Sequence, residues 1–253
     1  MEGMQVTADR TQADGPLRCD DPGYPALLRQ VQSGSCVAFI GSGPSTTDLL
    51  YPEWGEAVSR ICVHCGLPPM SNEEKEDVNV LLDRADEARV RDEARYCNAL
   101  KEIFGKPIVN TTRAYDLLID VRFRSYVTAN VDPLLADKSR SSKNRLGGVY
   151  TFPALPYDCI EKRSIYYLHG LVDVGVVPRP HQIVLGRQDF AHAYDESNGT
   201  LHSFLHQLFS FQTIVFVGCT LREPPIARIL ESCRKARGQI YGGCDALCFG
   251  VQY

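Results

Sequence analysis

Four short, mainly apolar runs divide the chain, and small or polar residues follow each of them. The runs cover residues 36–40, 125–128, 164–168 and 213–217. Near-continuous apolar runs of this length are typical of strands buried on both faces of a parallel sheet. Helical patterns separate them, so the sequence predicts an α/β fold with a Rossmann-like, doubly wound, mostly parallel sheet.

Two further strand candidates are shorter or lie later in the chain. One is the apolar triplet Ile183–Leu185, and the other is residues 245–252. No covering helix follows the second candidate, so we expect the chain to have been cut from a longer protein.

A charged helical segment fills residues 71–104. It opens with a capping box of Ser71 and Glu74 and closes at Gly105, and we interpret about residues 62–112 as a small helical insertion. Thr112 is expected to cap the next helix. The inward face expected for that helix is Ala114, Leu117, Leu118 and Val121.

Residues 1–22 are polar and without periodicity, which predicts a flexible leader before one folded domain over residues 23–253. Residues 137–164 are rich in lysine and arginine and predict a long basic loop. That loop could touch phosphate, but basic loops of this kind are usually solvated.

Composition excludes several classes of protein. The net charge of −4 gives no broad basic field, so we expect no direct nucleic-acid binding by this domain. No run reaches the roughly 18 apolar residues of a membrane span, and the start has no signal pattern, so a cytoplasmic protein without a membrane contact is expected. The ten irregularly spaced cysteines indicate reduced thiols.

The residues after the strands carry the chemistry. They are the segments Gly41–Ser45, Ala129–Asp132, His169–Gly170 and Gly218–Thr220. Because the carboxyl ends of parallel strands share one sheet edge, these segments are expected to meet there, where open α/β folds bind ligands.

The first segment, a Gly-Ser-Gly turn, lets backbone N–H groups approach a diphosphate. Thr46 stands where the dinucleotide fingerprint has its third glycine, and no acidic residue follows about twenty positions later, which disfavours hydride transfer. A tight turn that binds nothing is the alternative.

Three polar residues at this edge have two interpretations each. Asn130 can orient a ribose hydroxyl or a water, or simply tolerate an unusual backbone angle. Asp132 can do the same, or cap the helix that begins at Pro133. His169 stands at a strand end and suits a general base, although a lone histidine is more often structural.

Read in order, these segments resemble the sirtuin-like NAD-hydrolase domains of prokaryotic antiviral systems. The family pattern runs Gly-x-Gly-x-Ser, Pro-x-Trp, Thr-Thr-Asn-x-Asp, His-Gly and Gly-x-Ser-Leu-x-Asp-Pro, and it covers about residues 35–230. The matching residues are Gly41, Gly43, Ser45, Pro52, Trp54, Thr128, Asn130, Asp132, His169, Gly170, Gly218, Leu221 and Pro224. The chain departs from the pattern at Ala129, Thr220 and Glu223.

The resemblance implies a division of roles among these residues. Asn130 and His169 would carry the reaction. The dinucleotide would be lined by Gly41, Ser42, Gly43, Ser45, Asp132, Gly218, Thr220 and Glu223.

The paired Cys-x-x-Cys zinc ribbon of the related protein deacylases is missing. Cys62 and Cys65 form one such pair, but Cys244 and Cys248 have a different spacing and lie far away. We therefore predict buried thiols, no metal and no deacylase peptide cleft.

These observations predict an NAD⁺ glycohydrolase that releases nicotinamide and ADP-ribose. The resemblance implies an oligomeric effector of antiviral defence that depletes NAD and works with a sensor domain or partner. A non-catalytic module that senses NAD or an ADP-ribose derivative is the alternative, and an NAD-dependent protein deacylase is a weaker one.

Overall fold

A computed structural model describes residues 23–46, 50–107, 113–143, 146–156, 160–197, 199–220, 223–241 and 248–251. The predicted leader and Thr112 lie outside these residues. Within them, one six-stranded sheet has the order β3-β4-β2-β1-β5-β6, and every neighbouring pair is parallel. The strands are β1 Cys36–Ile40, β2 Ser125–Thr128, β3 Val149–Thr151, β4 Ile165–Tyr167, β5 Thr213–Val217 and β6 Cys248–Val251.

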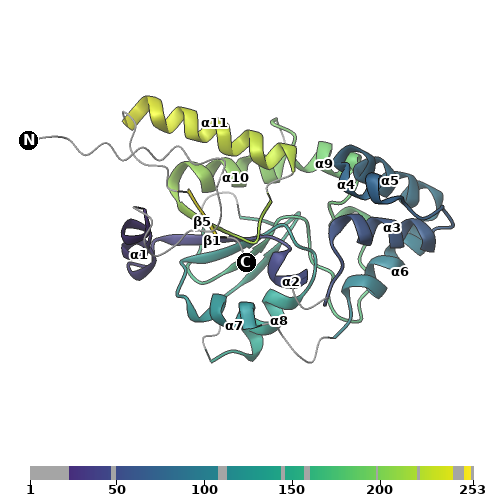
Figure 1. The fold of residues 1–253 in the computed structure, drawn as a ribbon, viewed down its shortest axis with the longest axis horizontal. Helices are drawn as coiled ribbons and strands as arrows, with labels where there is room; N and C mark the ends of the chain where they lie inside the picture. The colour runs from purple at the N-terminus through teal and green to yellow at the C-terminus, as the bar shows by residue number, and fades with distance from the viewer. Residues whose placement is uncertain are drawn as a thin grey trace, which may run out of the picture.

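Helices cover both faces of this sheet, as Figure 1 shows. Successive residues of β1 alternate between the faces: Ala38 and Ile40 pack in one hydrophobic cluster, whereas Val37 and Phe39 pack in the other. The helices are α1 Tyr24–Gln32, α2 Gly43–Thr46, α3 Trp54–His64, α4 Asn72–Glu76, α5 Val78–Arg91, α6 Glu93–Phe104, α7 Arg113–Asp120, α8 Leu134–Ser141, α9 Arg187–Ala193, α10 Thr200–Phe211, α11 Pro224–Tyr241 and a 3-10 turn, η1 Pro180–Gln182.

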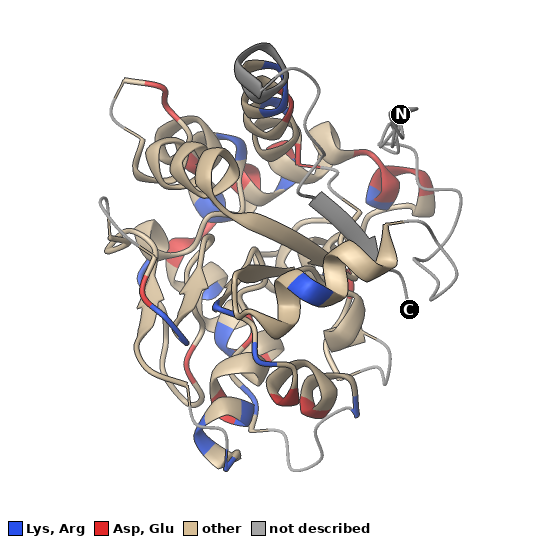
Figure 2. Cartoon of the chain, turned by 90° about the vertical axis from the view of Figure 1, so that its left-hand side faces the viewer, with Lys and Arg blue, Asp and Glu red and all other residues tan. Residues whose placement is uncertain are grey.

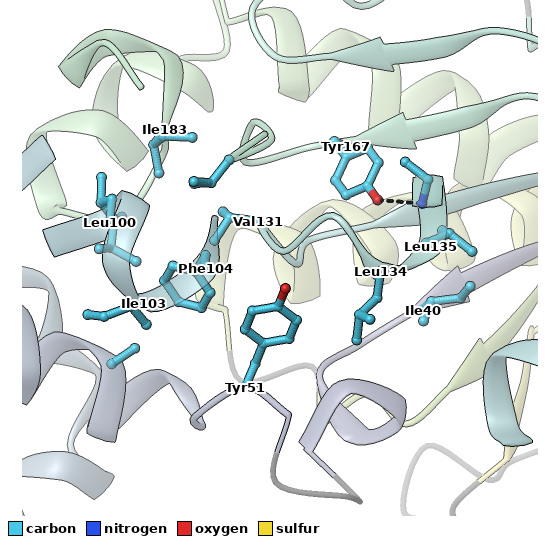
Figure 3. Packing of buried hydrophobic residues seen from close by; sticks show 14 of the residues in the cluster. Ile40, Tyr51, Leu100, Ile103, Phe104, Val131, Leu134, Leu135, Tyr167 and Ile183 are labelled. Atoms are coloured by element: carbon cyan, nitrogen blue, oxygen red, sulfur yellow. Dashed lines mark hydrogen bonds between the residues drawn. The ribbon is translucent and has the colours of Figure 1, made fainter. Parts of the chain in front are cut away.

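The first cluster joins the sheet to α7 and α8, and the second joins it to α10 and α11 (Figure 1). The Tyr167 hydroxyl accepts a hydrogen bond from the Ala136 N–H at 3.1 Å, which fastens α8 to the sheet (Figure 3). The fold is therefore α/β, Rossmann-like and doubly wound, as the sequence predicts.

The predicted helical segment is three helices, α4 to α6, packed against α3. The capping box of Ser71 and Glu74 is present, and Gly105 ends α6. Asp77 and Asp92 cap α5 and α6 with their side chains and so divide the segment.

Three predictions about the elements are wrong. Residues 183–185 are buried but form no strand: β3 already occupies the outer side of β4, and Val184 N–H bonds only to the His169 carbonyl, at 3.0 Å. The expected loop over residues 137–164 holds the end of α8 and all of β3. For the helix after residue 112, the predicted inward face is right for Leu118, which is buried, but wrong for Leu117 and for Val121, which follows α7; both are exposed, and Tyr115 and Ile119 are buried instead.

Among the described residues, no helix combines the length and apolarity that a membrane crossing requires.

Candidate functional site

A cavity of about 330 Å³ lies at the carboxyl edge of β5, β1, β2 and β4. This is where the strand order reverses: β2 and β5 flank β1, and later strands extend outward on both sides. Of the ten residues predicted for the site, Gly43 alone does not line the cavity. The nine that do are Gly41, Ser42, Ser45, Asn130, Asp132, His169, Gly218, Thr220 and Glu223.

The two glycine turns pack directly on each other. A Cβ on Gly41 would lie 2.3 Å from the Gly218 carbonyl oxygen, and Gly218 itself has a φ of +61°. The N–H groups of Gly41 and Gly43 donate to the carbonyls of Val217 and Gly218. These glycines are therefore needed for close approach of the turns, and their amides are not directed at a diphosphate as the sequence reasoning supposed.

Ser45 is the centre of a buried hydrogen-bond network. Its hydroxyl donates to Asp132 Oδ2 at 2.9 Å, and Asn130 Nδ2 donates to Ser45 Oγ at 3.2 Å. Because the single Ser45 proton goes to the carboxylate, the Tyr115 hydroxyl, 2.7 Å away, donates to Ser45. The network joins the β1 turn, α7 and the segment after β2.

Asn130 is held by both N–H groups of its amide. Besides Ser45, Nδ2 donates to the Gly41 carbonyl at 2.9 Å, and the Asn130 backbone N–H donates to Thr128 Oγ1 at 3.0 Å. With both amide donors committed to the protein, Oδ1 is the polar atom that Asn130 retains for a ligand donor.

Asp132 is buried, and both of its oxygens have partners. Oδ1 accepts from the Leu134 N–H at 3.1 Å, so Asp132 does bind the start of the following helix, but α8 begins at Leu134 with Pro133 as its N-cap residue, one position later than predicted. Desolvation raises the pKa of Asp132 to about 6, although hydrogen bonds from Ser45 and Leu134 oppose the shift. Its hydrogen bonds support Ser45 and α8. A direct contact of Asp132 with a dinucleotide stays a prediction.

His169 is 5% exposed and lies among aromatic rings. Its Nε2 is 2.8 Å from the Tyr194 hydroxyl, and its ring makes an edge contact with Phe190. Burial lowers the pKa of His169 to about 3, with a hydrogen bond to the backbone of Ala129 opposing the shift, so the imidazole is neutral at neutral pH. Asn130 and His169 thus line the same cavity, but their polar atoms have different partners: Asn130 bonds to Gly41 and Ser45, and His169 bonds to Tyr194.

The crevice thus holds the two packed glycine turns and the Asn130 and His169 side chains, which follow the neighbouring strands β2 and β4. Residues 124–242 match the model of the SIR2-like domain family. Over this segment the chain is similar to SIR2-like domains. SIR2-like domains bind NAD as a family. No curated protein matches the chain.

The SIR2-like match begins just before β2 and ends beyond α11, so it contains Asn130, His169, Gly218, Thr220 and Glu223. The Gly41–Ser45 turn precedes the matched segment in the chain. The structure nevertheless brings that turn into the same crevice, through the β1–β5 pairing and the Ser45 network.

Sequence reasoning missed four side chains of the SIR2-like crevice or its supports. Tyr115 and Tyr194 bond to Ser45 and His169, and Phe190 and Trp54 stack with ring centroids 6.3 Å apart along the wall. Trp54 Nε1 is buried without a hydrogen-bond partner among the described residues, so it can donate to a ligand. The Pro-x-Trp match was the available signal for Trp54; no local pattern marks the two tyrosines.

Glu223 brings a buried carboxyl to the cavity. Burial raises its pKa, and it acts electrostatically on both Tyr194 and Cys219. No cation pairs with it among the described residues. It can therefore accept hydrogen bonds from hydroxyl or amide donors of a ligand.

The helical segment completes the wall. Figure 3 shows Leu100, Ile103 and Phe104 of α6 facing Val131 and Ile183, all within one hydrophobic cluster. Phe104 and Leu81 also line the cavity. Part of the predicted insertion therefore borders the site.

The Cys62 and Cys65 thiols are buried and face the carbonyls of Arg84 and Asp92. Burial raises the pKa of both thiols, which disfavours the thiolate that a metal would need. Within the described ranges, no group of three or more His, Cys, Asp or Glu side chains could hold a metal ion. Cys244 lies outside the described residues.

Proposed function

We propose that this SIR2-like domain is an NAD⁺ glycohydrolase that releases nicotinamide and ADP-ribose. The observation that carries the proposal is the single crevice in which the fixed Asn130 amide, the His169 ring and the Gly41–Gly218 contact lie together. The family supplies the substrate class, because SIR2-like domains bind NAD.

Cleavage of the nicotinamide bond needs positioning more than acid catalysis. The transition state resembles an oxocarbenium ion, and the pyridinium leaves as a neutral molecule without protonation. In the proposal, Asn130 Oδ1 accepts a hydrogen bond from water or a ribose hydroxyl and holds it in register with the reacting carbon. The commitment of Nδ2 to Gly41 and Ser45 sets the orientation of that oxygen.

His169 is the proposed base. Its ring is neutral at neutral pH and so has a lone pair for a proton, but a pKa of about 3 makes it a weak base in the structure without a ligand. Its Nε2 is engaged by the Tyr194 hydroxyl at 2.8 Å. To take a proton from the substrate, Nε2 must exchange this bond for one to water or ribose. The proposal therefore requires a change at the His169–Tyr194 contact when NAD binds.

Nicotinamide release is the test. The chain is incubated with NAD, and free nicotinamide is measured by chromatography for the native chain, Asn130→Ala and His169→Ala. We expect each variant to lose at least about a hundredfold in rate, the lower range for general-base and positioning effects. Glu196→Gln, an exposed change outside the site, is the control. Native-like circular dichroism must accompany each loss, and full activity in either site variant would refute the assigned roles.

A non-catalytic NAD or ADP-ribose-derivative sensor is the second candidate. The observation that favours it is the His169–Tyr194 hydrogen bond, which occupies the ring nitrogen that a base would use. This candidate predicts thermal stabilisation by NAD without nicotinamide. Release only when an acylated peptide is added would instead indicate a deacylase.

The sequence resemblance extends the proposal to an oligomeric effector of antiviral defence that depletes NAD with a sensor partner. Expression in bacteria tests this extension: NAD should fall during phage infection with the native full-length protein and not with Asn130→Ala.

A further inference from the structure

An open depression of about 550 Å³ lies at the edge of the sheet opposite the crevice. It is formed where β1, β2 and β4 begin, whereas the crevice is formed where these strands end. Figure 2 views the molecule from the side on which α1 lies, and several lysine and arginine segments lie near the middle of that view. The depression is lined by Ser33, Gly34, Arg122, Phe123, Arg124, Lys143, Lys162 and Arg163.

Five of these residues are basic, and none of the described residues that line the depression is acidic. The cluster does not follow from general basicity, because the whole chain has 31 acidic against 27 basic residues. Asp120 and Arg163 both act electrostatically on Tyr126, with opposite effects on its pKa. Like charges drawn together in this way repel one another, and a bound anion removes that cost.

Two further observations, the Arg124 guanidinium and the Arg163 backbone, indicate a binding site in this depression. Arg124 is half-buried, and its Nε is buried without a hydrogen-bond partner among the described residues. A buried N–H of this kind costs about 1–3 kcal/mol unless an acceptor meets it. Arg163 adopts a φ of +59°, a left-handed conformation rare for a side-chain-bearing residue and often found at functional sites.

Secondary structure explains how these cations come together. Arg124 N–H donates to the Cys36 carbonyl at 2.7 Å, and the Arg163 N–H donates to the Arg124 carbonyl. These hydrogen bonds link the N-terminal ends of the neighbouring strands β1, β2 and β4. Arg122 and Lys162 are exposed at the rim of the depression. The arrangement depends on the sheet and not on one flexible basic loop.

We propose that this depression binds a small soluble anion with two or more phosphate groups. Arginine forks match phosphate oxygens and lysines add point charges. Even without Arg163, the lining carries four cations, Arg122, Arg124, Lys143 and Lys162, which is more charge than one negative group balances. The volume lies within the range of small-ligand sites, whereas a nucleic acid would require a longer basic stripe. The site is separate from the proposed NAD crevice.

Calorimetry with tripolyphosphate tests the inference at low ionic strength. The test variant is Arg122→Gln with Lys162→Gln, two exposed changes that leave the core intact. The matched control is Arg234→Gln with Lys235→Gln, an exposed pair on α11 with the same loss of charge. We expect the test variant to weaken binding by about tenfold or more and the control by less than about twofold.

Added salt should weaken binding by the native chain more steeply than binding by the test variant. Equal affinity for tripolyphosphate in the native chain and the test variant would overturn the inference. So would equal binding of sulfate, or binding to phosphatidylserine vesicles without binding to tripolyphosphate. None of these outcomes depends on NAD hydrolysis, so the inference and the proposed function fail separately.

Discussion

Ser45 joins three partners around one hydroxyl oxygen, and this residue decides how Asn130 faces the crevice. Its donation to Asp132 forces the Tyr115 and Asn130 donors onto its lone pairs. The orientation of the candidate catalytic amide therefore depends on a buried, mainly ionised carboxyl that need not touch the ligand.

Burial of Asp132 predicts a pH-dependent stability. Its pKa is about 6 in the folded chain against an ordinary 3.8, so the folded chain binds more protons between these values. Its contribution to the free energy of unfolding is fully present below pH 3.8 and is lost as pH rises through about 6. The free energy of unfolding of Asp132→Asn minus that of the native chain should therefore rise by up to about 3 kcal/mol between pH 4 and pH 7.5.

Urea unfolding at several pH values measures this difference, and Glu196→Gln controls for loss of one surface charge. His169 has the opposite slope because its folded pKa of about 3 is below the ordinary 6.5. It is present in both proteins, so its contribution cancels in the comparison. An Asp132→Asn difference that does not vary with pH would contradict the assigned burial cost.

At the scale of elements, α9 connects the helical segment to His169. Phe190 and Tyr194, in α9 and at its C-cap, contact the imidazole ring. The start of α9 is tied to α5 by the Arg89–Asp189 ion pair and by Gln188 N–H donating to Asp86 Oδ2 at 2.9 Å. The position of the candidate base is thus coupled to a helix that lies outside the sheet.

We expect loss of the two ion pairs between α5 and α9 to lower the free energy of unfolding by different amounts. Arg89 and Asp189 side chains are 14% and 12% exposed, so Arg89→Met leaves buried carboxylates unpaired and should cost about 3 kcal/mol. Arg187→Met breaks the exposed pair with Asp83 at the same interface and should cost less than about 1 kcal/mol.

Urea unfolding with a double-mutant cycle checks the coupling. Arg89→Met combined with Asp189→Asn should cost less than the sum of the two single changes, because the second change removes an unpaired charge. Additive effects would show that the pair does not hold α9 on α5.

The whole molecule places its polar chemistry at the two ends of one parallel sheet. The carboxyl edge carries the crevice proposed to bind NAD, and the amino edge carries the basic depression. Ligands at opposite edges need not compete.

Thermal unfolding tests this separation. ADP-ribose at about 100 times its Kd should add about 2.7 kcal/mol to the stability, and tripolyphosphate should add its own increment independently. We expect the two increases in Tm to sum when both ligands are present. A combined shift no larger than the greater single shift would show that both ligands enter one site.

Much of this arrangement was predictable from local patterns. Apolar runs identify buried strands, and small or polar residues directly after them identify the ligand edge, since parallel strands end together. Asn130, His169 and the two glycine turns were found in this way. The triplet at residues 183–185 shows the limit, because an apolar run reports burial and not pairing with a neighbour.

Local sequence patterns were sufficient to assign the class of fold and the residues that meet at the carboxyl edge of the sheet. The hydrogen-bond partners of those residues depend on packing: Tyr115 reaches Ser45 from 70 positions away, and Tyr194 reaches His169 from 25. Packing also brought five cations together at the amino edge. Periodicity along a chain encodes burial and turns, whereas hydrogen-bond partners depend on the packing of elements that are distant in that chain.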